Sequence, residues 1–171
     1  WEVVEITREG WRVIDSRDAP IRFTRRRGVL PLPEPVHGGD IDELRPLVNV
    51  SDHTQWILLC GCLVMMFHPE GPFPVLIVGG EQGCAKSSLC RMIRSLIDPN
   101  VAPLRRPPRK EDDLAIAAKN AWVIAFDNLS GLSPSLSDTL CSLATGSGFG
   151  TRQLYKDDDE KLFQATRPIL M

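Results

Sequence analysis

The sequence predicts an α/β fold in which helices flank a parallel β-sheet, with a small antiparallel β segment in front. Two observations lead to this prediction. From about residue 50 onward, short apolar runs typical of buried strands alternate with longer helical patterns, as in parallel sheets. Residues 1–35 instead alternate apolar and polar side chains with period two, broken by glycine and by Asp-Ala-Pro, which is typical of antiparallel strands.

The composition is that of an ordinary globular protein. The 171 residues are 43% hydrophobic and 25% charged, which is enough for one domain with a sizeable core. The formal net charge of −2 gives no overall attraction to nucleic acid, so any such binding must come from local basic clusters. Five cysteines without the spacing of a disulfide scaffold indicate buried free thiols and a reducing, cytoplasmic location.

We expect a small β-rich lead-in segment and linker over residues 1–40 and the main domain over residues 41–171. The runs WEVVEI, GWRVID and IRFTRR predict a meander of three short strands, and the proline-rich LPLPEPVHGGD predicts a linker. Because the chain starts at Trp1 and stops within an apolar run, we expect it to be part of a longer protein.

Helices and strands alternate through the main domain. The apolar run from Trp56 to Phe67 is too short to span a bilayer and predicts a buried helix, with Ser51 or Asp52 as its N-cap. PVLIVGG and AWVIAFDN predict strands buried on both faces. The remaining predictions are helices over KSSLCRMIRSLID, KEDDLAIAAKN and SPSLSDTLCSLATG, strands over VAPLRR and RPILM, and a hairpin over TRQLYKDDDEKLFQAT.

A glycine-rich loop separates the strand-like PVLIV from the helix that follows. From Gly80 to Ser87 it reads GEQGCAKS, which fits the phosphate-binding pattern G-x-x-x-x-G-K-[ST] at every fixed position except Ala85. Glycines let successive backbone N–H groups converge on an anion, and the helix N-terminus adds unpaired donors. The predicted ATP-binding residues are Gly80, Glu81, Gln82, Gly83, Cys84, Ala85, Lys86, Ser87 and Ser88.

Two residues of this loop have more specific predicted roles, and a third departs from the pattern. Lys86 can reach the β- and γ-phosphates, and the Ser87 hydroxyl can ligate Mg²⁺. Alanine at position 85 is the smallest departure from glycine, and it is tolerable if the residue has helical dihedrals. The alternative is a glycine-rich turn with a surface lysine.

A second acidic motif follows about forty residues after the lysine. A phosphate-binding loop of this type needs a carboxylate at the end of a neighbouring strand to hold Mg²⁺, and Asp127 ends WVIAFD. The alternative is an aspartate that only caps the next helix. Asn128 stands where many ATPases have a glutamate; an amide can orient water but cannot accept its proton. The predicted catalytic residues are Lys86, Asp127 and Asn128.

With GGEQGCAKSS, VIAFDN and GTRQLYKDDDEKLFQATRPILM in this order, the chain resembles the helicase-like ATPases of phage and plasmid replication proteins. These form the superfamily 3 and primase-helicase group of the AAA+ class of P-loop NTPases. The resemblance covers Val48 to Met171 and implies a helix, a basic β-hairpin and a further strand after the acidic motif. The Ala-Lys-Ser ending also looks like that of minichromosome-maintenance helicases, in which alanine before the lysine is an accepted variant.

The resemblance also implies partners. It implies ATP and Mg²⁺ as cofactors, DNA, in particular single-stranded DNA, as the partner, a ring of identical subunits, and a primase-like module upstream. Arg152 and Lys156 in the hairpin would contact DNA or a neighbouring subunit. A polar sensor residue, an arginine finger and a lid would lie past Met171. No membrane partner is expected.

Two basic clusters could meet DNA phosphates. These are Arg25-Arg26-Arg27 and the run RRPPRK, which contains Arg105 and Arg106. A solvated surface is the alternative for both. The overall hypothesis is an ATP-hydrolysing, helicase-like module of a DNA replication protein from a phage, plasmid or other mobile element. Its alternatives are a nucleotide-dependent switch with weak or no hydrolysis, and a P-loop small-molecule kinase.

Overall fold

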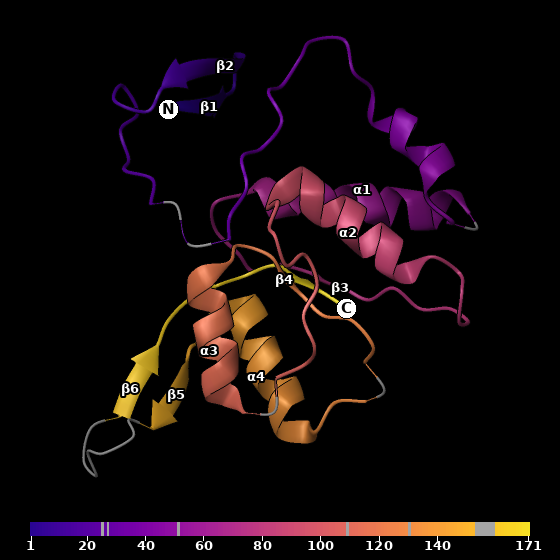
Figure 1. Ribbon diagram of the computed structural model, residues 1–171, viewed down its shortest axis with the longest axis vertical. Coiled ribbons are helices and arrows are strands. Elements are labelled where there is room, and N and C mark those ends of the chain that lie inside the picture. Colours follow the sequence, from indigo (N-terminus) through magenta and orange to yellow (C-terminus); the bar gives the residue numbers. More distant parts are fainter. Residues whose placement is uncertain (25, 27, 51, 109, 130, 153–159) are drawn as a thin grey trace.

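The computed structural model describes residues 1–24, 26, 28–50, 52–108, 110–129, 131–152 and 160–171. For residues 149–152 and 160–163 the description covers the backbone alone. Figure 1 shows a parallel sheet between two pairs of helices, with a separate N-terminal hairpin. The elements of the layered part are α1 (His53–Phe67), β3 (Val75–Leu76), α2 (Lys86–Ile97), α3 (Glu111–Asn120), β4 (Ile124–Ala125), α4 (Pro134–Thr145) and β7 (Ile169–Leu170).

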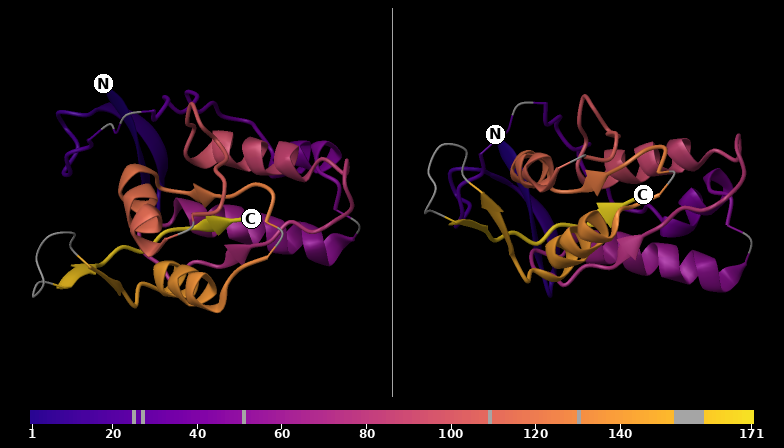
Figure 2. Two further views of the ribbon diagram at one scale, coloured as in Figure 1. Left: turned by 60° about the horizontal axis from the view of Figure 1, so that its bottom comes forward. Right: turned by 90° about the horizontal axis from the view of Figure 1, so that it is seen from below.

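The sheet has the strand order β3-β7-β4, and both pairings are parallel. Its strands send alternate side chains to opposite faces. Val123, Ala125 and Leu170 pack with α1 and α2, whereas Ile124, Phe126 and Ile169 pack with α3 and α4. Strand β4 and its flanks are therefore buried on both faces, as the run AWVIAFDN predicts. The two views of Figure 2 show the same layering from other directions.

Strand β3 differs from its prediction because it lies at the edge of the sheet. Val75 and Leu76 are only half-buried, and Ile77 just beyond them is 69% exposed. The prediction that this strand is buried on both faces is therefore wrong. At the opposite edge, VAPLRR contributes a single parallel bridge between Arg105 and Phe126 rather than a full strand.

Helix α1 begins as predicted, because the Asp52 carboxylate caps it by accepting a hydrogen bond from the backbone N–H of Gln55 at 2.9 Å. The prediction of a buried helix holds for one face, formed by Trp56, Leu59, Leu63 and Met66. The opposite face is equally apolar, and its side chains are more than half exposed: Ile57, Leu58, Val64 and Phe67. One layer of sheet can cover only one side of a helix.

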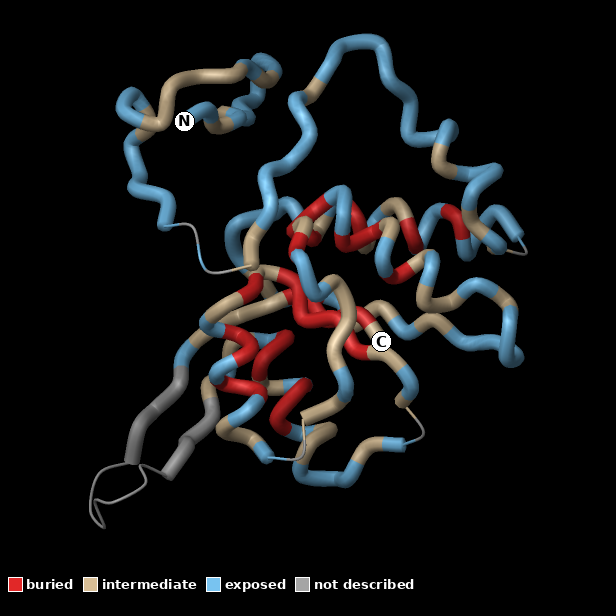
Figure 3. The backbone as a smooth tube through the Cα atoms, in the orientation of Figure 1, coloured by how far each residue is buried: buried red, intermediate tan, exposed pale blue. Residues whose placement is uncertain are grey.

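The N-terminal segment forms a hairpin of β1 (Glu2–Thr7) and β2 (Gly10–Asp15), not a three-stranded meander. After β2, the Asp15 carboxylate accepts hydrogen bonds from the backbone and the guanidinium of Arg17, and the resulting turn leads the chain away from the hairpin. Ile21–Thr24 are exposed and form no strand. A 3₁₀-helix follows over Ile41–Leu47, and Figure 3 shows no buried residue in the described chain before Trp56.

The remaining helices and strands follow their predictions. Helix α2 ends at Ile97 with Asp98 as its C-cap, and α4 is capped by Ser133 and closed by Gly146 in the left-handed conformation. The hairpin consists of β5 (Phe149–Arg152) and β6 (Glu160–Phe163) in antiparallel pairing. Its predicted tip lies outside the described residues. None of the helices in the described chain is long and apolar enough to cross a membrane.

Candidate functional site

The glycine-rich loop and the end of β4 meet at the carboxyl edge of the parallel sheet. The loop joins β3 to α2, and Asp127 follows β4, with β7 hydrogen-bonded between the two strands. In open α/β sheets, ligands bind outside the carboxyl ends of the strands, where loops from non-adjacent strands face one another. The fold thus brings the two predicted motifs to the place where a ligand can contact both.

Residues with positive φ occur at alternate positions of the loop. Gly83 has φ +88° and Ala85 has φ +63°, whereas Cys84 and Lys86 have no positive φ. Alternation of this kind is typical of the backbone nests that bind anions. The condition of helical dihedrals at position 85 is not met: Ala85 is the left-handed residue just before α2.

Replacing Ala85 by glycine is expected to leave the free energy of unfolding unchanged or to raise it by up to about 1 kcal/mol. The left-handed conformation costs an alanine roughly 1–2 kcal/mol, and the greater entropy of glycine in the unfolded chain offsets part of that gain. Urea unfolding monitored by circular dichroism measures the change. Ala115→Gly inside α3 is the control and should lower stability by about 1 kcal/mol or more. Equal losses in the two variants would contradict the left-handed assignment.

Close packing inside the loop explains its first glycine. A Cβ on Gly80 would lie 2.6 Å from Cys84 Sγ, and Gly80 has φ +149°, so a side chain there has neither space nor a suitable backbone. Lys86 Nζ donates hydrogen bonds to the carbonyl oxygens of Gly80 at 2.7 Å and Glu81 at 2.5 Å. The ammonium therefore lies over the loop rather than in open solvent.

Ser87 and Asp127 are in direct contact although they are 40 residues apart in the sequence. The Ser87 hydroxyl donates a hydrogen bond of 2.7 Å to Asp127 Oδ1, and the contact is partly buried. Both are oxygen ligands of the kind that Mg²⁺ prefers. The structure thus brings together the two residues that the sequence predicts to hold a metal.

Burial, together with the nearby Asp127 carboxylate, raises the pKa of the Cys90 thiol above its ordinary value.

Asn128 lies next to this pair. Its backbone N–H donates to Asp127 Oδ1 at 3.1 Å, and its φ of +57° is left-handed, a conformation that asparagine tolerates better than most residues. Its side chain is exposed. An amide at this position can donate to or accept from a water molecule beside Asp127.

A buried ion pair fixes α2 relative to β4, and the sequence interpretation did not include it. Arg94 is fully buried and donates to Asp98 Oδ2 at 3.1 Å and to the carbonyl oxygens of Asp98 and Pro103. The same carboxylate oxygen accepts the backbone N–H groups of Trp122 at 2.9 Å and Val123 at 3.0 Å. The i,i+4 spacing of Arg94 and Asp98 is the sequence signal for this pair.

The predicted DNA-contacting residues are scattered. The backbone carbonyl of Arg105 accepts a hydrogen bond from the Asp127 N–H at 2.8 Å, so Arg105 and Arg106 lie beside the end of β4. Arg105 is half-buried, and Arg106 is exposed. The backbone of Arg152 ends β5, its side chain is not described, and Lys156 lies outside the described residues.

The cysteines are free, as predicted, but they are not uniformly buried. Cys90 is buried, Cys60, Cys62 and Cys84 are half-buried, and Cys141 is exposed, so the prediction of burial is wrong for Cys141. Within the described residues, no cluster of three or more histidine, cysteine, aspartate or glutamate side chains could hold a metal ion.

Comparison with known families gives one finding. The model of the actinomycete integrative conjugative element replication protein matches residues 41–171, which include the glycine-rich loop, Asp127 and all four α-helices. No curated protein and no solved structure matches the chain. This chain belongs to the family of actinomycete integrative conjugative element replication proteins, and so to the replication proteins of conjugative mobile elements.

Proposed function

We propose that this chain is the ATP-binding and ATP-hydrolysing, helicase-like module of the replication protein, with a P-loop NTPase fold of the AAA+ type. The observation that carries the proposal is the 2.7 Å hydrogen bond from Ser87 to Asp127. A hydroxyl at the start of the loop helix and a carboxylate at the end of a neighbouring strand are the two protein ligands that P-loop NTPases use for Mg²⁺.

The order of elements after Asp127 supports the same proposal. Helix α4, the hairpin β5–β6 and strand β7 follow in the order implied by the resemblance to helicase-like ATPases. Strand β7 then pairs in parallel with both β3 and β4. This pairing holds the loop after β3 and the acid after β4 at one edge of the sheet.

The chemistry follows from what each side chain can do. The N–H groups around Gly83 and Ala85 would bind phosphate oxygens, and Lys86 would exchange its bonds to Gly80 and Glu81 for bonds to the β- and γ-phosphates. Ser87 and Asp127 would hold Mg²⁺, directly or through water. When bound, that ion would neutralise the negative charge that develops on the phosphates.

Asn128 is the residue in this set that bears on the rate of hydrolysis. Its amide can orient an attacking water molecule, but it cannot take up the proton. We therefore expect slow turnover by this chain. The presence of an amide instead of a carboxylate at position 128 also favours a second candidate function, a switch that binds ATP without hydrolysing it. No described contact favours a small-molecule kinase.

Replacing Lys86 by alanine is expected to weaken ATP binding about 10- to 100-fold, because hydrogen bonds to charged phosphates are lost. Titration with a fluorescent ATP analogue in the presence of Mg²⁺ measures this change. Alkylation of Cys84, whose sulfur lies 3.7 Å from Lys86 Nζ, gives a second readout: at an ATP concentration near the wild-type Kd, ATP should slow it in the wild type and much less in the variant.

Lys110→Ala is the matched control, because it removes the same charge from an exposed site at the start of α3. It should bind ATP as the wild type does. Equal affinity of the wild type and of Lys86→Ala, with no protection of Cys84, would contradict the proposal.

The wider assembly is also proposed. We infer single-stranded DNA as the partner, a ring of identical subunits as the working form, and a primase-like module elsewhere in the full protein. The family supports a DNA partner in general terms, since its members are replication proteins.

A further inference from the structure

An exposed basic segment connects the N-terminal hairpin to the layered domain. Residues 19–33 contain four arginines and no acidic residue. Within them, Ile21–Thr24 and Arg26, here called the basic segment, are all exposed, with Phe23 at 56% and Ile21 at 59%. In the described part of the chain, neither Arg22 nor Arg26 forms an ion pair or a side-chain hydrogen bond.

The basic segment lies beside a backbone contact between residues 28–30 and 99–101, here called the anchor. Leu30 donates its backbone N–H to the Pro99 carbonyl at 2.9 Å, Val101 donates to the Gly28 carbonyl at 3.0 Å, and Val29 forms an antiparallel bridge with Asn100. A Cβ on Gly28 would lie 3.3 Å from Val101 Cγ2, and its φ of +90° also favours glycine. The anchor thus depends on close approach of two backbones.

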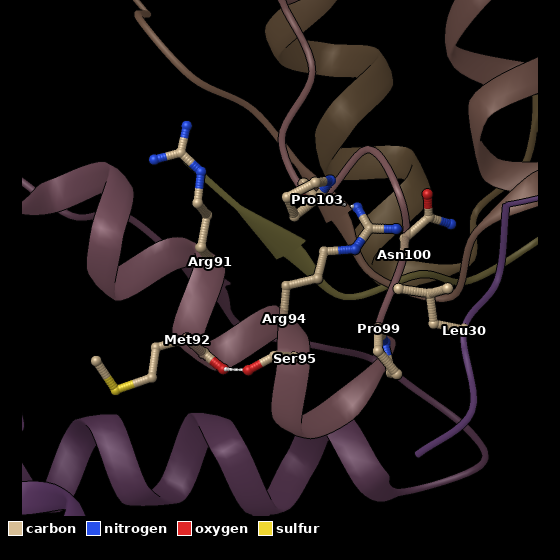
Figure 4. Close-up of a pocket in the computed structure, with 8 residues that line it drawn as sticks. All are labelled: Leu30, Arg91, Met92, Arg94, Ser95, Pro99, Asn100 and Pro103. Atoms are coloured by element: carbon tan, nitrogen blue, oxygen red, sulfur yellow. Dashed lines mark hydrogen bonds between the residues drawn. The ribbon is translucent and has the colours of Figure 1, made fainter. Parts of the chain in front are cut away.

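The anchor joins the basic segment to the helix of the candidate nucleotide site. Pro99 follows directly after Asp98, the C-cap of α2, and α2 begins at Lys86. Leu30 also lines a pocket of about 360 Å³ together with Arg91 and Arg94 of α2 (Figure 4). Arg91 is exposed, and Figure 4 shows its guanidinium pointing away from Leu30.

We propose that the basic segment binds single-stranded DNA, with Phe23 stacking on a base and Arg22 and Arg26 contacting phosphates. An exposed aromatic ring between unpaired cations is the arrangement that single-strand binders use. A duplex offers no free base face to Phe23. This inference rests on the DNA partner proposed above but does not depend on ATP binding or hydrolysis.

The test is fluorescence anisotropy of a labelled oligothymidine of 20 nucleotides, without nucleotide and over a range of salt concentrations. Phe23→Ala is expected to weaken binding about tenfold, within the range known for single stacked bases. The double variant Arg22→Ala/Arg26→Ala is expected to lower the salt dependence, the slope of log K against log salt, by about 1.4. The substituted side chains are exposed, so the fold should be unaffected, and circular dichroism checks this.

Arg8→Ala/Arg12→Ala is the matched control, because it removes two exposed charges from the hairpin instead. It should keep the wild-type affinity and slope. The proposal is overturned if the wild type does not bind the oligothymidine, or if it binds duplex DNA as tightly as the single strand. It is also overturned if Phe23→Ala leaves the affinity unchanged, or if the control variant lowers the affinity and the slope as much as Arg22→Ala/Arg26→Ala does. A failure of the nucleotide proposal would leave this assay unchanged, since it contains no ATP.

Discussion

Asp127→Ala is expected to remove the Mg²⁺ dependence of ATP binding and to lower any ATP turnover by about a hundredfold or more. The reason is that Asp127 supplies the only carboxylate in contact with Ser87 in the described structure. A metal ion contributes several kcal/mol of charge stabilisation in phosphoryl transfer, and its loss removes that contribution. Titrations of an ATP analogue with and without Mg²⁺ measure the first effect, and phosphate release measures the second.

Variants of the same pair separate the metal from the fold. Ser87→Thr keeps the hydroxyl and should retain Mg²⁺ dependence, whereas Ser87→Ala should lose it. Asp138→Ala removes an exposed carboxylate from α4 and should behave as the wild type. If Asp127→Ala retained full Mg²⁺ dependence, the carboxylate after β4 would not be the metal ligand.

Asp98→Ala is expected to lower the free energy of unfolding by about 3–5 kcal/mol. It leaves the fully buried Arg94 guanidinium without its carboxylate, and breaking a buried ion pair on one side typically costs that much. It also leaves the backbone N–H groups of Trp122 and Val123 without their acceptor. Urea denaturation followed by circular dichroism measures the loss.

A second variant distinguishes the charge from the hydrogen bonds. Arg94→Met/Asp98→Asn removes both charges and keeps an acceptor near Trp122 and Val123, so it should lose less stability than Asp98→Ala. Asp113→Ala at an exposed position in the first turn of α3 should change stability by less than about 1 kcal/mol. If Asp98→Ala also lowered the free energy of unfolding by less than about 1 kcal/mol, the ion pair would not hold α2 to β4.

Much of the fold and of the candidate site could be predicted because it depends on local spacing. The helix starts at Asp52 and Ser133 are set by side-chain caps that a sequence displays directly. The contact between Ser87 and Asp127 was also predictable, since a loop after one parallel strand and an acid after another must share an edge of the sheet.

The features that could not be predicted depend on what lies across space. The run IRFTRR alternates like a strand, but no partner strand lies beside Ile21–Thr24. Helix α1 and strand β3 are apolar enough for full burial, yet their positions at the outside of the layers leave Val64 and Ile77 exposed. The i,i+4 spacing of Arg94 and Asp98 gives no sign that the Asp98 carboxylate also accepts from the backbone of Trp122 and Val123 and so joins α2 to β4.

Steady-state hydrolysis of ATP with and without single-stranded DNA is the most direct test of the proposal that the loop before α2 and Asp127 form an ATP-hydrolysing site. We predict slow, Mg²⁺-dependent phosphate release that DNA increases and that Lys86→Ala abolishes. ATP binding without phosphate release, with or without DNA, would contradict hydrolysis and favour the switch. Neither binding nor release in the wild type, or identical behaviour of Lys86→Ala, would contradict the nucleotide site itself.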